Sequence, residues 1–257
     1  MQLEIQDPVT HDPAVAITDV TKLFGQGRDA IAALDHVSLD VAPGEFVCLL
    51  GASGCGKSTL LNLVADLDRP TSGTISVQAG GVGLMFQESA LFPWLTARGN
   101  VELALKLRRV PRGERRGRVD ELLAMVHLSD FAGKLPHELS GGMRQRVALA
   151  RALAQDADVL LMDEPFGALD AMTRDVLHDE LESLWADRAF TVLFVTHNVR
   201  EAAGLADRVV LLSSRPGGVV EAFDVGIERP RRIDSPEVSS LAARITDSLR
   251  EEVRRHA

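Results

Sequence analysis

A glycine-rich segment that ends in Lys57, Ser58 and Thr59 is the part of this chain best suited to chemistry. It follows the apolar run 46–50 and precedes a helical pattern over 60–67. Glycines let backbone N–H groups surround phosphate oxygens, and a following helix directs its positive end at the same oxygens. Lys57 adds a positive charge, and Ser58 offers a hydroxyl to Mg²⁺. The pattern therefore predicts a nucleoside triphosphate site, contacted by Gly51, Ser53, Gly54, Cys55, Gly56, Lys57, Ser58 and Thr59.

Two adjacent carboxylates, Asp163 and Glu164, follow the apolar run 159–162. An apolar strand delivers its last residues to the carboxyl edge of an α/β sheet, where ligands bind. Near a phosphate-binding loop, a strand-end aspartate holds Mg²⁺, and a second acid beside it can accept a proton from the attacking water. We therefore expect Asp163 to serve the metal and Glu164 to act as the general base.

A second anion site is predicted where Ser140, Gly141 and Gly142 open a helical pattern that includes 147–153. Backbone N–H groups at the start of a helix attract negative charge. Taken by itself, this pattern indicates only a helix cap. It becomes informative because it lies in the same chain as the phosphate-binding loop and the acidic strand end.

Cys55 lies inside the phosphate-binding loop, near Lys57 and the start of a helix. Both neighbours favour a thiolate, so the sequence leaves two readings open: a reactive thiol, or an inert small residue at a variable position. The other cysteine, Cys48, lies in the preceding apolar run. The two residues indicate reduced thiols rather than a disulfide framework.

The elements that must position these groups alternate along the chain. Strand signals occur at 14–20, 33–41, 45–50, 73–77, 82–86, 158–162, 191–196 and 208–212, and residues 96–154 show helical periodicity instead. Strands that alternate with helices indicate a largely parallel sheet covered on both faces. The expected fold class is therefore α/β, with a P-loop NTPase (RecA-like) core, an antiparallel β layer before it and an inserted α-helical subdomain.

The tail carries its own signals. Ser235 followed by Pro236 is typical of a helix start, and an apolar stripe follows at Val238, Leu241, Ala242, Ile245 and Leu249. We expect this helix to pack on the core of the chain.

Bulk properties exclude two classes of function. The formal net charge of −9 argues against a sequence-independent nucleic-acid binder, so no nucleic-acid partner is expected. No apolar run approaches the roughly 18 residues of a membrane span, so any role in a membrane needs a separate membrane protein.

Together these motifs resemble those of ATP-binding-cassette (ABC) ATPases. In that comparison, Ser140–Gly142 is similar to the signature motif, Gln87 to the Q-loop glutamine, and His197 to the switch histidine. The segment 167–170, ending in Asp170, is similar to the D-loop, and Phe24 stands where the family places an adenine-stacking aromatic. The resemblance covers about residues 14–215.

The resemblance implies a nucleotide-binding domain over 14–215, with a helical subdomain at about 88–154 and a C-terminal hairpin and helix over 216–257. It implies ATP and Mg²⁺ as cofactors, with catalytic roles for Lys57, Gln87, Glu164 and His197. Ser58, Gln87 and Asp163 are the implied metal residues. ATP is expected to lie between two copies, so that Ser140 and Gly142 of one copy close over the γ-phosphate held by the other.

Segments 87–94, 164–174 and 212–217 look most like the nitrate/sulfonate/taurine group of bacterial importers. This implies a peripheral subunit on the cytoplasmic side of the cell membrane, with permease subunits and an extracytoplasmic solute-binding protein as partners. Residues 91–94 are the expected permease contact. Two alternatives remain. One is a subunit of an exporter or of a membrane-complex disassembly machine. The other is a soluble ABC ATPase of DNA repair or chromosome organisation, but the segment from Gln87 to Leu139 shows neither the heptads of the long coiled coil nor the cysteine cluster of the zinc hook that such chains usually carry.

Overall fold

Two β-sheets and a group of helices form the structure, a computed structural model that describes residues 12–25, 27, 30–78 and 80–255. The larger sheet has the strand order β5-β6-β7-β3-β8-β9. Its strands are β3 (Phe46–Leu50), β5 (Val82–Met85), β6 (Val159–Asp163), β7 (Thr191–Val195), β8 (Arg208–Leu212) and β9 (Val219–Asp224).

Strand β3 lies in the middle of this core sheet, parallel to β7 on one side and to β8 on the other. All five of its residues are buried. Phe46, Cys48 and Leu50 belong to one hydrophobic cluster, and Val47 and Leu49 belong to the other. Because successive side chains of a strand point to opposite faces, this division shows that both faces of the sheet are covered.

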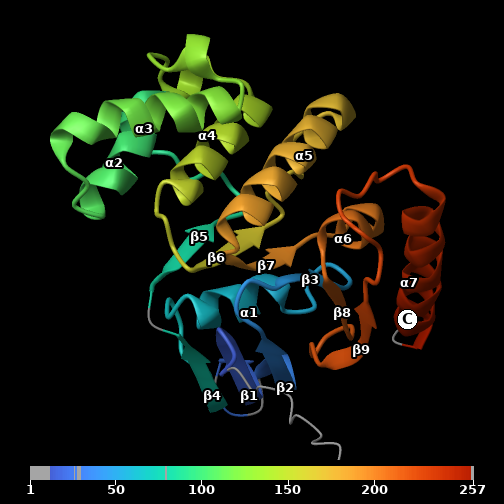
Figure 1. The fold of residues 1–257 in the computed structure, drawn as a ribbon. Coiled ribbons are helices and arrows are strands. Elements are labelled where there is room, and N and C mark those ends of the chain that lie inside the picture. The colour runs from blue at the N-terminus through green and yellow to red at the C-terminus, as the bar shows by residue number, and fades with distance from the viewer. Residues whose placement is uncertain (1–11, 26, 28–29, 79, 256–257) are drawn as a thin grey trace, which may run out of the picture.

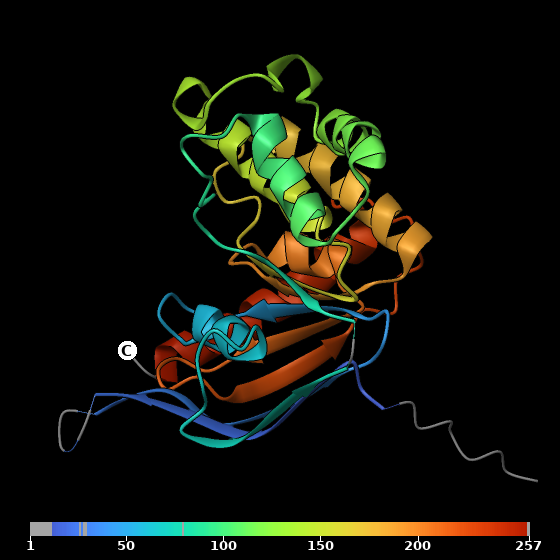
Figure 2. The same cartoon turned by 90° about the vertical axis from the view of Figure 1, so that its left-hand side faces the viewer.

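One face is covered by α1 (Lys57–Val64) and by a three-stranded antiparallel sheet of order β2-β1-β4 (Figures 1 and 2). The strands are β1 (Val15–Phe24), β2 (Ile31–Val41) and β4 (Ser72–Val77). Both pairings are antiparallel, and both contain register shifts.

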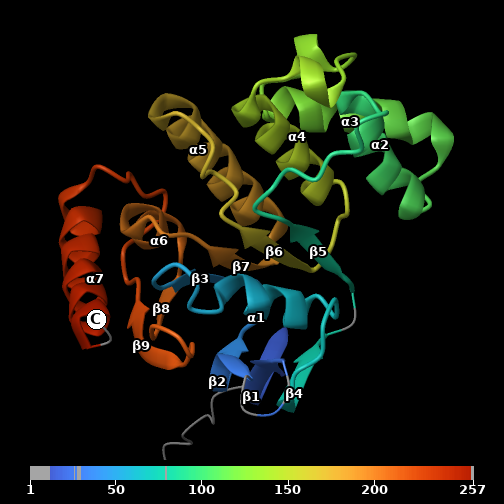
Figure 3. The same cartoon turned by 180° about the vertical axis from the view of Figure 1, so that it is seen from behind.

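The opposite face carries the helices between β5 and β6, which stand together at the top of Figure 3. They are α2 (Ala97–Leu107), α3 (Arg112–Met125), two short 3-10 helices (Ser129–Phe131 and Pro136–Glu138) and α4 (Gly141–Leu153). The side chain of Thr96 caps α2, and that of Ser140 caps α4. A side-chain cap satisfies one of the N–H groups that a helix start leaves unpaired, and so fixes where each helix begins.

The same face carries α5 (Ala171–Arg188), α6 (Val199–Leu205) and α7 (Pro236–Arg255). The Ser235 hydroxyl accepts a hydrogen bond from Val238 N at the start of α7. Val238 and Ile245 of α7 are fully buried in the core cluster. The apolar stripe of the tail therefore packs on the remainder of the chain.

The α/β fold class predicted from the sequence is confirmed, and the strands lie within a few residues of the expected ranges. The tail contributes one further strand to the core sheet. Strand β9 pairs antiparallel with β8 and so extends the core sheet at its edge. Within the described part of the chain, no helix combines the length and apolar character needed to cross a membrane.

Candidate nucleotide-binding site

The carboxyl ends of four parallel strands bring the chemically active segments to one edge of the core sheet. Strand β3 leads into the glycine-rich loop, and β6 ends at Asp163. Strand β7 runs into Thr196 and His197, and Gln87 follows β5 by two residues. Since β3, β7, β6 and β5 are successive parallel neighbours, these segments converge on the same edge.

The glycine-rich loop has a backbone that requires glycine. Gly54 and Gly56 have φ angles of 78° and 99°, in the left-handed region that side chains disfavour. A Cβ on Gly56 would lie 2.6 Å from the carbonyl oxygen of Ala33. Helix α1 begins directly after the loop with no side-chain cap. Its first N–H groups are thus left for a ligand, and Gly56 packs too closely against Ala33 to be replaced by a larger residue.

Lys57 is buried, and its ammonium group donates to the carbonyl oxygens of Gly51 and Ala52 at 2.8 and 3.0 Å. These contacts curl the side chain back over the glycine-rich loop. The charge is therefore held where the loop and the start of α1 meet, which suits it to an anionic ligand.

Asp163 lies beside Ser58, and the two side chains share a hydrogen bond. Burial raises the pKa of the Asp163 carboxyl, and the Ser58 hydrogen bond and the Lys57 charge oppose that rise. A hydroxyl and a buried carboxylate side by side are oxygen donors of the kind that Mg²⁺ takes from proteins. The donor set thus fits the metal expected from the sequence.

Glu164 is the point at which three predicted site residues meet. Its Oε2 atom accepts a hydrogen bond from Gln87 Nε2 at 3.3 Å and lies 3.2 Å from His197 Nδ1. Its backbone N–H donates to Val195 O at 2.9 Å and continues the ladder between β6 and β7. Its φ angle of 46° is unusual for a residue other than glycine. Such strained backbone is concentrated at functional sites.

Helix α4 holds the segment after Gln87 in place. Gln145 Nε2 donates to the Gln87 carbonyl oxygen at 3.2 Å. Arg151 donates to the carbonyl oxygens of Ser89 and Ala90 at 2.9 and 2.7 Å. Sequence reasoning missed both side chains. The buried face of α4 is otherwise apolar, so the polar side chain of Gln145 stands out on it. That departure from the apolar pattern is the sequence signal that could have identified Gln145.

Ser140, Gly142 and Asp170 form a second group of predicted residues. Ser140 Oγ accepts from Met143 N at 3.2 Å, and Asp170 accepts from Thr173 N at 3.0 Å, so each caps a helix. The Thr173 backbone N–H lowers the pKa of the Asp170 carboxyl. A Cβ on Gly142 would lie 3.2 Å from the side chain of Leu169, so the segments 140–142 and 167–170 are neighbours. Among described residues, no hydrogen bond joins this group to the glycine-rich loop.

Phe24 ends β1 and is exposed, with the Lys22 ammonium 5.0 Å from its ring centroid.

The environment of Cys55 does not match the interpretation of this residue as a reactive thiol. Its side chain is 1 % exposed and belongs to the hydrophobic cluster beneath α1. Its sulfur lies 3.6 Å from Lys57 Nζ, on the inner side of the loop. Burial keeps reagents away from a thiol whatever its charge, so the structure favours the inert interpretation.

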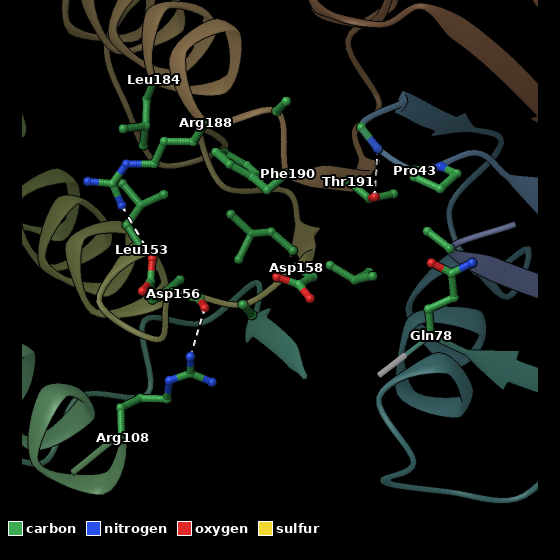
Figure 4. Close-up of a pocket in the computed structure, with 17 residues that line it drawn as sticks. Pro43, Gln78, Arg108, Leu153, Asp156, Asp158, Leu184, Arg188, Phe190 and Thr191 are labelled. Atoms are coloured by element: carbon green, nitrogen blue, oxygen red, sulfur yellow. Dashed lines mark hydrogen bonds and ion pairs between the residues drawn. The ribbon is translucent and has the colours of Figure 1, made fainter. Parts of the chain in front are cut away.

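A pocket of about 470 Å³ lies at the opposite edge of the core sheet, where β6 and β7 begin (Figure 4). Its charged side chains are largely paired with protein groups. Arg188 lies 3.5 Å from the Asp156 carboxylate, and Arg108 donates to the Asp156 carbonyl oxygen at 3.0 Å. The phosphate-binding and acidic segments do not reach this pocket, so we do not assign the candidate site to it.

Comparison with known proteins gives consistent results. A family model described as "ABC transporter" matches residues 34–167. The taurine import ATP-binding protein TauB of Mesorhizobium japonicum is 50 % identical over 220 residues, which cover 83 % of this chain and 85 % of that protein. The nitrate import ATP-binding protein NrtD of Synechocystis sp. is 47 % identical over 218 residues, 82 % of each chain.

Among solved structures, a dimeric ATP-binding cassette in a post-hydrolysis state, bound to ADP and Pi, is similar to this fold. It has a TM-score of 0.77 and 35 % sequence identity, and the match covers 83 % of this chain and all of that one.

Proposed function

This chain belongs to the ABC transporter family of ATP-binding proteins, and from that premise we propose that it is the ATP-hydrolysing subunit of a membrane importer for a small anionic solute. The convergence of Gln87 and His197 on the Glu164 carboxylate, beside the phosphate-binding loop, is the observation that carries this proposal. Two relatives are named as nitrate and taurine import proteins, and these solutes support the choice of a small anionic solute.

ATP is assigned to the glycine-rich loop and the start of α1, with Phe24 stacking on the adenine. Lys57 would exchange its carbonyl contacts for phosphate oxygens. The hydroxyl of Ser58, the Asp163 carboxylate and the Gln87 amide are the groups that would hold Mg²⁺. The bound metal would supply positive charge to the phosphate oxygens as the terminal phosphoryl group leaves.

Glu164 is the group placed to accept a proton from the attacking water. His197 and Gln87 fix the orientation of its carboxylate from two sides. Their contacts with one oxygen, Oε2, leave the other carboxylate oxygen for the water. A base held in one orientation needs no rearrangement at the moment of proton transfer, which is the advantage of a preorganised site.

Two copies of the chain are needed to complete the site. In the described part of the chain, no hydrogen bond joins the segment 140–142 or Asp170 to the phosphate-binding loop. The helix that starts at 141 has no acidic residue in its first turn, so its N–H groups can attract an anion from outside. Ser140, Gly141 and Gly142 of a second copy would therefore contact the γ-phosphate. The dimeric state of the similar cassette supports this arrangement.

An apolar groove between the core and the helical group is the surface we assign to the permease. Its cavity is about 520 Å³, and it is lined mainly by apolar side chains, which include Leu67, Leu84, Phe86, Phe92, Leu103 and Leu107. Exposed apolar surface of this kind is typical of a protein interface. Trp94 stands beside it with its ring 5.5 Å from that of Phe92, within the segment 91–94 expected from the sequence.

The groove is physically connected to the catalytic carboxylate. Ala90, in the groove wall, is held by Arg151, which also lines the groove. Three residues earlier, Gln87 contacts Glu164. A permease segment that enters the groove would thus displace a short, hydrogen-bonded stretch that ends at the site of hydrolysis. A permease embedded in the membrane places this subunit at its cytoplasmic face, with a solute-binding protein on the other side.

The test is reconstitution. The tagged chain, purified from its own cell membranes in mild detergent, should retain permease subunits that mass spectrometry identifies. Proteoliposomes that contain this complex and its solute-binding protein should accumulate labelled nitrate or taurine only with Mg²⁺–ATP on the side of this subunit. Efflux driven by ATP would contradict the import direction, and failure of the tagged chain to retain any membrane protein would contradict the transporter role.

A further inference from the structure

The residues on either side of His197 share one buried anchor. Thr196 Oγ1 donates to Glu201 Oε2 at 2.5 Å, and Asn198 Nδ2 donates to Glu201 Oε1 at 3.3 Å. Thr196 Oγ1 also accepts from Asn198 N at 3.0 Å. Both carboxylate oxygens of one side chain therefore hold the two neighbours of the histidine.

Glu201 belongs to α6 and is 5 % exposed, which is exceptional for a carboxylate. A buried carboxylate is tolerated when its oxygens have partners. Here they have the two loop residues and Arg174 of α5, whose Nε lies 3.4 Å from Oε1. The anchor is thus a connected set of buried polar groups, and the removal of one member leaves another buried group without its partner.

His197 itself depends on this anchor. Its side chain is 65 % exposed, and its Nδ1 atom lies 3.2 Å from the Glu164 carboxylate. A largely exposed side chain gains little positional restraint from a surface contact of this kind. The backbone at positions 196 and 198 must therefore supply the precision that the side chain lacks.

From this geometry we propose that Glu201 is a positioning residue for ATP hydrolysis: it fixes the 196–198 loop so that His197 faces Glu164. The proposal rests on the hydrolytic role assigned above. Glu201 does not reach the reacting atoms and acts through Thr196 and Asn198.

Arg174 extends the cluster toward the expected dimer interface. Besides its contact with Glu201, its guanidinium donates to Leu169 O at 2.9 Å. Leu169 immediately precedes Asp170 and packs beside Gly142, which belongs to the segment assigned to the γ-phosphate of the other copy. The same cluster therefore ties the 167–170 segment to the loop that carries His197.

The decisive experiment is a double-mutant cycle between Thr196 and His197. Thr196→Val removes the hydroxyl that joins the loop to Glu201 and keeps the shape of the side chain. We expect kcat for ATP hydrolysis to fall about tenfold or more, with the dissociation constant of a fluorescent ATP analogue within twofold of wild type. Thr196→Ser, which keeps the hydroxyl, should restore most of kcat. In a His197→Ala background, Thr196→Val should cause no further loss, because it acts only through the histidine.

Two further variants distinguish positioning from stability. Glu201→Gln, nearly the same in shape, should also lower kcat and leave nucleotide affinity unchanged. Thr246→Val removes a comparable hydroxyl contact, to Ala242 O in α7, and should leave kcat unchanged even where it lowers the melting temperature.

The experiment distinguishes a failure of the positioning role from a failure of the role assigned to His197. If His197→Ala loses activity and Thr196→Val stays within twofold of wild type, or if the two losses multiply, the positioning role is rejected and the proposed function stands. If His197→Ala retains full activity, the role of the histidine fails, and the inference fails with it.

Discussion

Glu164 and His197 face each other from neighbouring strands of the core sheet, with His197 Nδ1 3.2 Å from Glu164 Oε2. The relationship is built by the backbone, since Glu164 N donates to Val195 O and so pairs the two strand ends. Glu164 has a left-handed backbone conformation, which changes the direction of the chain at the carboxyl edge of the core sheet. The parallel ladder of β6 and β7 thus brings the segments that carry the base and its orienting group side by side.

The first prediction concerns the general base. Glu164→Gln keeps the size of the side chain and removes its ability to take a proton, so turnover should fall by about 10²–10⁴-fold while ATP still binds. A phosphate-release assay measures the turnover, and an equilibrium binding measurement tests whether ATP still binds. The variant should also form an ATP-dependent dimer in gel filtration. Turnover within threefold of wild type would remove Glu164 from this role.

The second prediction separates the two halves of the composite site. Ser140→Arg places a bulky cation where the partner's γ-phosphate is expected, so hydrolysis should stop while the monomer still binds nucleotide. The lost helix cap costs about 1 kcal/mol, which circular dichroism can monitor. A mixture with Lys57→Ala protein should regain activity, because one intact site re-forms in the mixed dimer. If mixed dimers are shown to form and remain inactive at every ratio, the composite site is excluded.

A third prediction tests the groove. Leu107 lines it and is 75 % exposed, so Leu107→Glu should disrupt permease binding at little cost to the fold. Basal ATP hydrolysis by the free subunit should stay near the wild-type rate. Leu91, named by sequence reasoning, is a poorer target because it packs against the core. Val253→Glu on α7 is the matched control, and equal losses of permease binding in both variants would argue against the groove.

Local motifs were predictable because their chemistry constrains neighbouring residues. The backbone of the glycine-rich loop demands glycine at Gly54 and Gly56, and Asp163 with Glu164 must follow an apolar strand. Helix starts at Ser140 and Ser235 were likewise visible, since a cap bonds to the backbone three residues on. Each of these signals lies within a few positions of the residue it concerns.

Contacts between distant segments were not predictable in the same way. Arg151 reaches Ser89 across 62 positions, and Gln145 reaches Gln87 across 58. These pairings depend on how the helical group folds back on the core, which no single-sequence pattern encodes. The anchor formed by Glu201 was missed for a related reason: an acid two positions into a helix normally reads as a solvated first-turn residue, and only its burial distinguishes it.

The fourth prediction concerns the cysteines. Both are buried, and burial raises the pKa of the Cys48 thiol well above its ordinary value. In the folded protein, a maleimide should therefore label neither residue within the time that labels an exposed thiol. Both should react fully in denaturant, as mass spectrometry can count. Rapid labelling of Cys55 in the folded state, with protection by Mg²⁺–ATP, would restore the reactive interpretation of that residue.

The last prediction follows from His178 on α5, which is 2 % exposed and whose ring nitrogens have no hydrogen-bond partner. Burial, helped by the charge of Arg174, lowers its pKa to about 4. Glu201 lies 3.8 Å from Nε2, too far for a hydrogen bond, and the ring packs edge-on against Phe166. The other charged groups that border the same cavity are Asp175, Asp179, Arg200, Arg232 and Asp234.

A histidine with a depressed pKa binds its proton more readily in the unfolded chain. Its contribution to stability is therefore complete above pH 6.5 and is lost as the pH falls toward 4. Compared with His178→Leu, which has no proton to bind, the wild-type protein should lose about 2 kcal/mol of its free energy of unfolding between pH 7.5 and pH 5. Urea unfolding of both proteins at the two pH values measures this difference. His137→Leu, at an exposed position on a 3-10 helix, is the matched control for a histidine-to-leucine change away from the buried site. A parallel decline in the wild-type and His178→Leu proteins would show that the buried imidazole is not the group responsible.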